Sequence, residues 1–289
     1  MALKPTKPAA KPVETTGHEW DGLAELNNPL PKWWLYTWIA CIVVAVGQMV
    51  LYPSIPGISG YWHGLLGYST RAGVDRDVKA LVVQRAASMD KIAAMPIDAV
   101  MRDAELAQMA NTSGRITFAN NCQPCHGAGG AGAAGYPALA AGAWIWGGTL
   151  GDIEQTVTHG IRNADTDSRT SAMPRFGADG ILSAPEIQSV ADHVMTFYGT
   201  PTPGVDTAKG AELFAANCAA CHGEKGEGNR TVGAPKLASR VHLYGTTRAA
   251  VVSQITAPRQ GMMPAWNTRL DPATIKSVAI YVHGLGGGE

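Results

Sequence analysis

Apolar residues near the start of the chain are gathered into one long run. The run extends from Trp33 to Tyr52 and has no charged side chain. A helix of about 20 such residues, rising about 1.5 Å per residue, spans the ~30 Å hydrocarbon core of a bilayer. Tryptophan and tyrosine lie at its two ends, as they do where helices cross membrane interfaces. The pattern predicts a transmembrane helix over residues 33–52.

A buried core helix and a cleaved signal peptide are the alternatives to this anchor. A signal peptide has a shorter apolar stretch, about 7–15 residues, that ends at a small-residue cleavage site. Here a polar segment, residues 1–32, precedes the run, and the run ends in Tyr52-Pro53. We therefore expect an uncleaved anchor in a lipid bilayer. Residues 1–16, rich in Lys, Pro, Ala and Thr, are expected to be disordered.

Basic residues lie unevenly on the two sides of the expected membrane helix. Lysines precede it, whereas the first Lys or Arg after it is Arg71. Positive charge is retained on the cytoplasmic side of bacterial membranes, so we expect residues 1–32 to be cytoplasmic and the rest of the chain to be periplasmic. Residues 53–112 then have apolar positions at helical intervals among polar ones, interrupted at Pro96. We expect them to form a periplasmic helical spacer.

From residue 113 onward the chain repeats itself. Met173-Pro174 in the first copy corresponds to Met263-Pro264 in the second. The duplication predicts two tandem domains over residues 113–200 and 206–289, a common size for small domains. Helical signals dominate both copies, so the expected fold class is mainly α. The best-matched positions are Gly114, Phe118, Asn121, Cys122, Cys125, His126 and Gly127 in the first copy and Gly210, Phe214, Asn217, Cys218, Cys221, His222 and Gly223 in the second.

Each copy contains one Cys-x-x-Cys-His motif, the pattern of covalent haem c attachment. Two thiols three positions apart on a helical turn can each form a thioether with one vinyl group of the same porphyrin. The next residue, His, then lies beneath the iron as an axial ligand. The motifs predict two haem c groups in two class I cytochrome c-like domains. The covalent ligands are Cys122, Cys125, Cys218 and Cys221, and the axial histidines are His126 and His222.

A redox-active dithiol and a zinc site are the alternative interpretations of these motifs. A thioredoxin-like dithiol occurs beside a βαβ pattern, which is missing from this sequence. A zinc site built on a Cys pair needs two further Cys or His at close spacing, and these are also missing. Two occurrences in matching contexts favour haem c. Cys41 lies alone in the apolar run and is interpreted as a buried apolar residue.

Met173 and Met263 are the candidates for the sixth iron ligand. A thioether is a soft ligand that favours reduced iron, so His/Met ligation raises the reduction potential. The Pro after each Met favours an extended backbone, which suits a loop that crosses a haem face. Met262 is the alternative to Met263, and His159 is the alternative to Met173. With both axial positions filled, a haem carries electrons and does not bind oxygen or peroxide.

Composition limits the functions that remain. Lys plus Arg and Asp plus Glu both number 23, so the formal net charge is zero. A neutral chain with few charged residues is not expected to bind nucleic acid through a polybasic surface. Its hydrophobic fraction of 46% is sufficient for packed cores.

Motifs on both sides of the membrane helix resemble those of one known family. The run Asn27-Asn28-Pro29-Leu30-Pro31, followed by a single membrane helix and two haem c motifs, is similar to subunit III of cbb3-type cytochrome c oxidases. The resemblance spans residues 17–289. The segments Trp144–Thr149 and Gly261–Trp266 also match. One departure is the alanine-rich stretch Ala138–Ala143, where the family has other residues, and this stretch bears on the surroundings of the first haem.

The resemblance implies a role and a set of partners. It implies that the chain accepts electrons in the periplasm, at the bacterial inner membrane, and relays them to an oxygen-reducing core in aerobic respiration. The implied partners are a catalytic haem b/copper subunit, a monohaem c subunit and a soluble or membrane-bound cytochrome c donor. It also implies Met173 and Met263 as axial ligands and no catalytic site in this chain. The alternatives are a dihaem peroxidase and a membrane dihaem cytochrome that serves another dehydrogenase or reductase.

Overall fold

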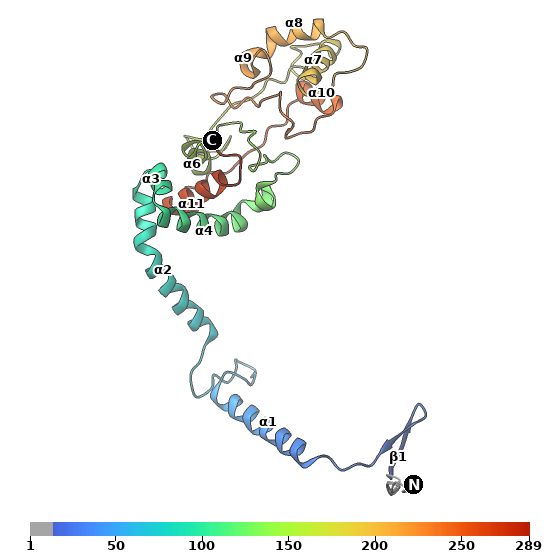
Figure 1. Ribbon diagram of the computed structural model, residues 1–289, viewed down its shortest axis with the longest axis vertical. Coiled ribbons are helices and arrows are strands. Elements are labelled where there is room, and N and C mark those ends of the chain that lie inside the picture. Colours follow the sequence, from blue (N-terminus) through green and yellow to red (C-terminus); the bar gives the residue numbers. More distant parts are fainter. Residues whose placement is uncertain (1–13) are drawn as a thin grey trace, which may run out of the picture. The chain divides into compact units, whose positions relative to one another are not determined.

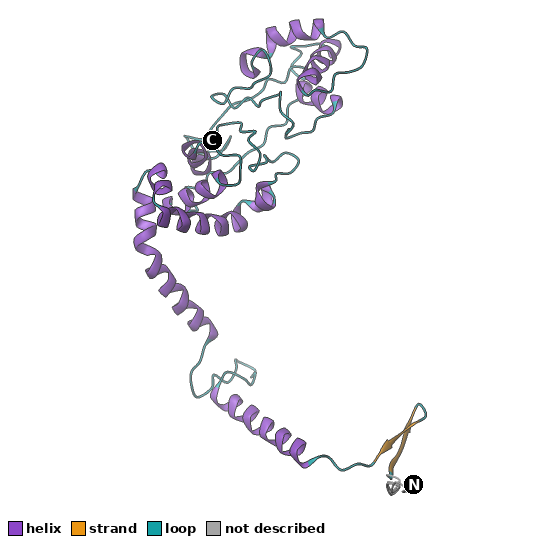
Figure 2. Ribbon diagram, in the orientation of Figure 1, coloured by secondary structure: helices purple, strands orange, loops and turns teal. Residues whose placement is uncertain are grey.

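The computed structural model describes residues 14–289 and is mainly helical (Figures 1 and 2). The chain divides into two units, one that ends at Leu81 and one that runs from Val82 to Glu289. The first unit holds the membrane-helix candidate. The second holds both Cys-x-x-Cys-His motifs, so the candidate sites are described within that unit alone.

A β-hairpin precedes the membrane helix. Strands β1 (Thr15–Trp20) and β2 (Leu23–Leu26) pair in antiparallel fashion. Asp21 and Gly22 join them with positive φ angles of 50° and 83°, the backbone that a tight two-residue hairpin turn requires. Thr15 and Thr16 belong to β1, so the expectation of disorder is wrong at these two residues. Residues 1–13, the rest of that segment, lie outside the described residues.

Helix α1 (Lys32–Leu51) is the expected membrane helix, displaced by one residue. It has 20 residues, a mean hydropathy of 1.9 over its best window, and side chains that are almost all exposed. The loop after it folds back on its end, where the Trp62 indole and the Leu65 amide donate hydrogen bonds to the Val50 carbonyl. These bonds satisfy a carbonyl that a helix end leaves without a partner.

The expected spacer is helical, but its last part belongs to a folded core. It contains α2 (Thr70–Ala94), α3 (Ile97–Arg102) and the start of α4 (Ala104–Asn121). Asp103 separates α3 from α4 by capping α4, because its carboxylate accepts hydrogen bonds from two amides of the first turn. Ile92 and Val100 are completely buried. The spacer boundary at residue 112 is therefore wrong, since burial begins about 20 residues earlier on the chain.

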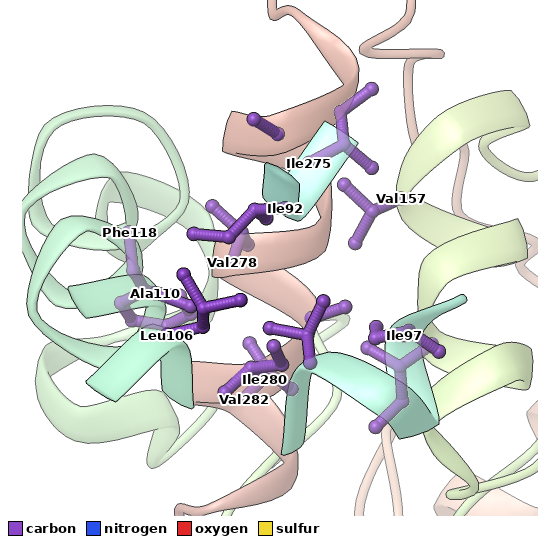
Figure 3. Packing of buried hydrophobic residues seen from close by; sticks show 14 residues of the cluster. Ile92, Ile97, Leu106, Ala110, Phe118, Val157, Ile275, Val278, Ile280 and Val282 are labelled. Atoms are coloured by element: carbon purple, nitrogen blue, oxygen red, sulfur yellow. The ribbon is translucent and has the colours of Figure 1, made fainter. Parts of the chain in front are cut away.

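The second unit contains two hydrophobic cores, which we call module 1 and module 2. Module 1 is formed by α4, α6 (Leu150–His159) and α11 (Pro272–His283), with α3 against them. Figure 3 shows α11 in the middle of this core, with Phe118 from α4 on one side and Val157 from α6 on another. Helix α11 comes from the second sequence repeat, whereas α4 and α6 come from the first.

Module 2 has the complementary composition. It is formed by α7 (Ala184–Phe197), α8 (Ala208–Asn217) and α10 (Arg248–Thr256). Helix α7 closes the first repeat, whereas α8 and α10 belong to the second. Phe214 of α8 packs against Phe197 of α7, with ring centroids 5.2 Å apart.

The two sequence repeats therefore exchange their closing segments. The chain leaves module 1 after α6, contributes Met173 and α7 to module 2, and returns after α10 to contribute Met263 and α11 to module 1. The contiguous boundaries 113–200 and 206–289 describe the repeats but are wrong as boundaries of packed domains. Apolar contacts between first and last helices decide the packing, and they run across the repeats.

A buried ion pair connects α7 to α10 in module 2. Asp192 is 5% exposed, and its carboxylate accepts hydrogen bonds from the Arg248 guanidinium at 2.6 and 2.7 Å and from the Thr202 hydroxyl at 2.7 Å. The bonds from Arg248 hold the pKa of Asp192 below its usual value, although burial acts in the opposite direction.

Asp192→Asn is expected to lower the free energy of unfolding at neutral pH by about 2 kcal/mol, because the charge that pairs with Arg248 is lost. A carboxyl with a lowered folded-state pKa stabilises the fold above its unfolded pKa of about 3.9 and loses that contribution as the pH falls. Thermal unfolding of the two proteins should therefore differ less at acidic pH than at neutral pH. Asp179→Asn, at an exposed ion pair, is the control and should change little. An equal difference at both pH values would contradict this account.

Candidate haem-binding sites

The first Cys-x-x-Cys-His motif forms a single tight turn at the end of α4. Cys122 follows the last residue of α4, and its carbonyl accepts hydrogen bonds from the Cys125 amide at 3.1 Å and the His126 amide at 2.9 Å. The short helix α5 (Gln123–His126) therefore places both thiols and the imidazole on one turn. This is the arrangement that attachment of one porphyrin through two vinyl groups needs.

The His126 ring is oriented by a backbone carbonyl. Its Nδ1 lies 3.1 Å from the Pro137 carbonyl oxygen, which can only accept a hydrogen bond. Nδ1 must therefore carry the proton, which leaves Nε2 with a free lone pair for iron. Burial lowers the pKa of His126 and so favours the neutral, ligating form of the ring.

An apolar cavity lies beside this motif in module 1. Cys122 and His126 line it together with Trp144 and Trp146, the side chains expected near the first haem. Met263, from the second sequence repeat, lines the same cavity. A hydrophobic pocket with one free imidazole nitrogen, one thioether and two adjacent thiols fits a covalently bound haem c. The pocket is closed by Phe118, Leu139, Ile153, Val157, Ile161, Val278 and Val282.

The thiols have the properties of attachment points rather than of a redox pair. None of the five cysteines, all within the described residues, forms a disulfide. Burial, and after it the neighbouring Cys125, raises the pKa of Cys122 to about 11. Burial likewise raises the pKa of Cys218 to about 11. A dithiol that exchanges disulfides has at least one lowered thiol pKa, so these values argue against that alternative.

The second motif repeats the geometry of the first. The carbonyl of Cys218 accepts from the His222 amide at 2.9 Å, and α9 (Ala219–His222) corresponds to α5. His222 Nδ1 lies 3.1 Å from the Pro235 carbonyl oxygen, and burial lowers the pKa of this ring as well. Met173, from the first repeat, packs against the core of module 2 that contains Cys218.

The alternative methionine and histidine ligands have other surroundings. Met262 is 69% exposed and does not line the cavity that Met263 lines. His159 ends α6, and its Nδ1 lies 3.0 Å from the Asp165 carboxylate. His159 is therefore held by an acidic partner, whereas Met173 packs in module 2. The geometry favours Met263 and Met173. Cys41, expected to be buried, is exposed on α1.

Sequence reasoning identified the side chains of both sites but not which methionine accompanies which motif. It also missed the proline carbonyls that orient the histidines. A signal for them was present, because Pro137-Ala-Leu139 and Pro235-Lys-Leu237 are matched positions of the repeat. No local signal revealed that Ile161 pairs with Met263 through two backbone hydrogen bonds of 3.0 Å.

Two family models match the chain in sequence. The N-terminal domain of cytochrome oxidase-cbb3, FixP, matches residues 12–59, which include the hairpin and α1. Cytochrome C oxidase, cbb3-type, subunit III, matches residues 109–194 and 205–282. The second model matches twice, once over each repeat. The two models together match most of the chain.

Curated relatives match over almost their whole length. A cbb3-type cytochrome c oxidase subunit CcoP of Cereibacter sphaeroides is 48% identical over 290 residues, covering 100% of both chains. A subunit FixP of Azorhizobium caulinodans is 50% identical over 277 residues, or 95% of this chain and 94% of the relative. A subunit FixP of Bradyrhizobium diazoefficiens is 46% identical over 276 residues, with 95% of each covered.

Proposed function

The chain belongs to the family of subunit III of cbb3-type cytochrome c oxidases, and from this premise we propose that it carries two haem c groups, one in each module, as the relay of such an oxidase. It is a membrane-anchored electron-transfer subunit of the respiratory chain, as its family and α1 indicate. The proposal adds the number of haems and the residues that hold them. It also adds the side of the membrane on which they lie.

The observation that carries the proposal is the composition of the module 1 cavity. There Cys122 and His126 from the first repeat and Met263 from the second line one apolar space. We assign Cys122 and Cys125 to covalent attachment and His126 and Met263 to axial ligation. By the same reasoning, Cys218 and Cys221 attach the second haem, and His222 and Met173 are its axial ligands.

These residues suit electron transfer rather than catalysis. Bound haem iron supplies one-electron chemistry by cycling between its ferric and ferrous forms. The chain holds the imidazole in one tautomer, presents a thioether that favours the ferrous form, and excludes water with apolar walls. A Met at each site leaves no axial position for peroxide, so we propose that this subunit has no catalytic site of its own and is not a dihaem peroxidase.

The proposed topology places both modules in the periplasm. The Lys residues of segment 1–32 support a cytoplasmic N-terminus, because basic residues are retained on that side. The proposed partners are a catalytic haem b/copper subunit and a monohaem c subunit of the bacterial inner-membrane oxidase, with a soluble or membrane-bound cytochrome c as donor. α1 is exposed along its length and offers Gly47 for close approach to a partner helix.

Haem counting by mass tests the proposal. The purified full-length chain should carry the mass of two haems after denaturation, because thioether bonds survive unfolding. Cys122→Ala/Cys125→Ala and Cys218→Ala/Cys221→Ala should each carry one, whereas Cys41→Ala should carry two. Purification in mild detergent should also recover a haem b subunit. A chain of unmodified mass, or one isolated as a free monomer without haem b, would contradict the proposal.

A further inference from the structure

We propose that Arg162 is a positioning residue that ties the two methionine loops together, so that it sets the axial ligation of both haems at once. This inference rests on the proposed function. Its Nε donates to the Gly261 carbonyl at 2.7 Å, and its Nη1 donates to the Ser171 carbonyl at 3.1 Å. Gly261 lies two residues before Met263, and Ser171 lies two residues before Met173. One guanidinium therefore bridges the segments that present both proposed sulfur ligands.

The backbone of Arg162 is held in an unusual conformation. Its φ is +50°, in the left-handed region that side chains other than Gly seldom adopt. Among the described residues, Asp21 in the hairpin turn is the other non-glycine residue with positive φ. Such a conformation persists where its surroundings fix it, and it is found at functional positions. Here the Arg162 amide donates to the Arg169 carbonyl at 2.9 Å.

The position of Arg162 in the chain fits a bridge between modules. It directly follows Ile161, whose backbone pairs with Met263 in module 1, and it lies on the segment that leaves for module 2. Its side chain is half-buried, and burial lowers its pKa, but a guanidinium remains charged at physiological pH. Hydrogen bonds from a charged donor are the stronger kind, and the planar guanidinium can serve two carbonyls at fixed angles.

Each methionine also has a private contact, and this makes the proposal testable. Asn163 Nδ2 donates to the Met263 carbonyl at 2.8 Å and to the His159 carbonyl at 2.9 Å. Gln260 Nε2 donates to the Met173 carbonyl at 3.1 Å. Removing either amide should therefore disturb one haem. Removing the Arg162 side chain should disturb both.

The experiment uses the full-length, haem-loaded chain. Arg162→Gly removes the side chain without backbone strain, because Gly adopts positive φ freely. We expect imidazole to displace the iron-bound sulfur at least about tenfold faster at both haems, the factor that loss of one charge-assisted hydrogen bond amounts to. Loss of the far-red sulfur-to-iron absorption band follows this displacement. Both reduction potentials should fall together in redox titrations.

Matched variants separate a positioning role from a structural one. Asn163→Ala should accelerate displacement at the haem on Cys122 and Cys125 alone, and Gln260→Ala at the other haem alone. Arg162→Lys keeps the charge but not the planar fork, so it should restore at most one haem. Arg259→Ala removes an exposed guanidinium that stacks on Tyr244 and should change neither haem.

Arg162→Gly that unfolds like the unmodified chain and changes one haem or neither would overturn the inference, as would full restoration of both haems by Arg162→Lys. Failure of the inference is distinguishable from failure of the proposed function. In the first case the unmodified chain has two sulfur-ligated haems and Arg162→Gly leaves them unchanged. In the second the unmodified chain lacks sulfur-ligated haem altogether.

Discussion

Met263→His is expected to lower the reduction potential of the haem attached through Cys122 and Cys125 by a few tenths of a volt, a shift on the order of what axial ligands produce. The cause is the exchange of a soft thioether, which favours ferrous iron, for an imidazole, which favours ferric iron. The other haem should keep its potential. Met263 lines the cavity of His126, although the two residues belong to different sequence repeats.

The affected haem is identified by combining variants. Redox titration of Met263→His in a Cys218→Ala/Cys221→Ala background leaves only the first haem in view, and its potential should be the lowered one. Met262→His is the matched control, because this neighbour is 69% exposed and should leave both potentials unchanged. A lowered potential at the haem on Cys218 and Cys221 instead would mean that each repeat supplies its own methionine.

Gly114→Val is expected to lower the free energy of unfolding by 3 kcal/mol or more, at the upper end of about 1–3 kcal/mol for overpacked cores. A Cβ at Gly114 on α4 would lie 2.0 Å from the Ser277 carbonyl oxygen on α11. Backbone atoms cannot move aside as side-chain ends can, so the two helices would have to separate. Thermal unfolding of the purified chain in mild detergent measures the effect. Gly210→Val should behave similarly, since its Cβ would lie 2.1 Å from the Ser189 carbonyl oxygen.

Gly151→Ala is the control for this pair. Gly151 lies in α6 with nothing within 4 Å of an added Cβ, so the substitution should be neutral or stabilising by about 0.5–1 kcal/mol. A loss of stability at Gly151 equal to that at Gly114 would contradict the packing account. Helix propensity would then explain both results.

A double-mutant cycle connects the Gly114 result to the exchange of segments. Phe118 on α4 packs against Tyr281 on α11, with ring centroids 5.3 Å apart. Aromatic pairs in contact couple by about 0.5–1.5 kcal/mol. Phe118→Leu and Tyr281→Leu should therefore be non-additive, whereas Phe118→Leu and Tyr198→Leu should add. The opposite outcome would place α7, and not α11, against α4.

The side chains of both haem sites could be predicted from the sequence because each carries a chemical reason at a fixed spacing. The thiol pair, the following His and the recurring Met-Pro are local patterns, and local patterns need no knowledge of the fold. The membrane helix was predicted to within one residue for the same reason, since length and hydropathy are local properties. The hairpin was missed although Asp21-Gly22 is a recognised turn signal.

The exchange of segments could not be predicted from residue patterns, because the two repeats offer the same partners. Gly114 and Gly210 are equivalent positions, as are Ser189 and Ser277, so either pairing of helices satisfies the same sequence. Chain connectivity does distinguish them. The short connection between α7 and α8 favours packing of these consecutive helices against each other. Thr202 in that connection is fixed to Asp192 on α7.

The most direct test of the crossed arrangement is a density map of the haem-loaded chain within its purified complex, read at the iron of the haem attached to Cys122 and Cys125. The account predicts the Met263 sulfur opposite the His126 imidazole, with Met173 opposite His222. Met173 opposite His126, or a haem with no sulfur ligand, would contradict it.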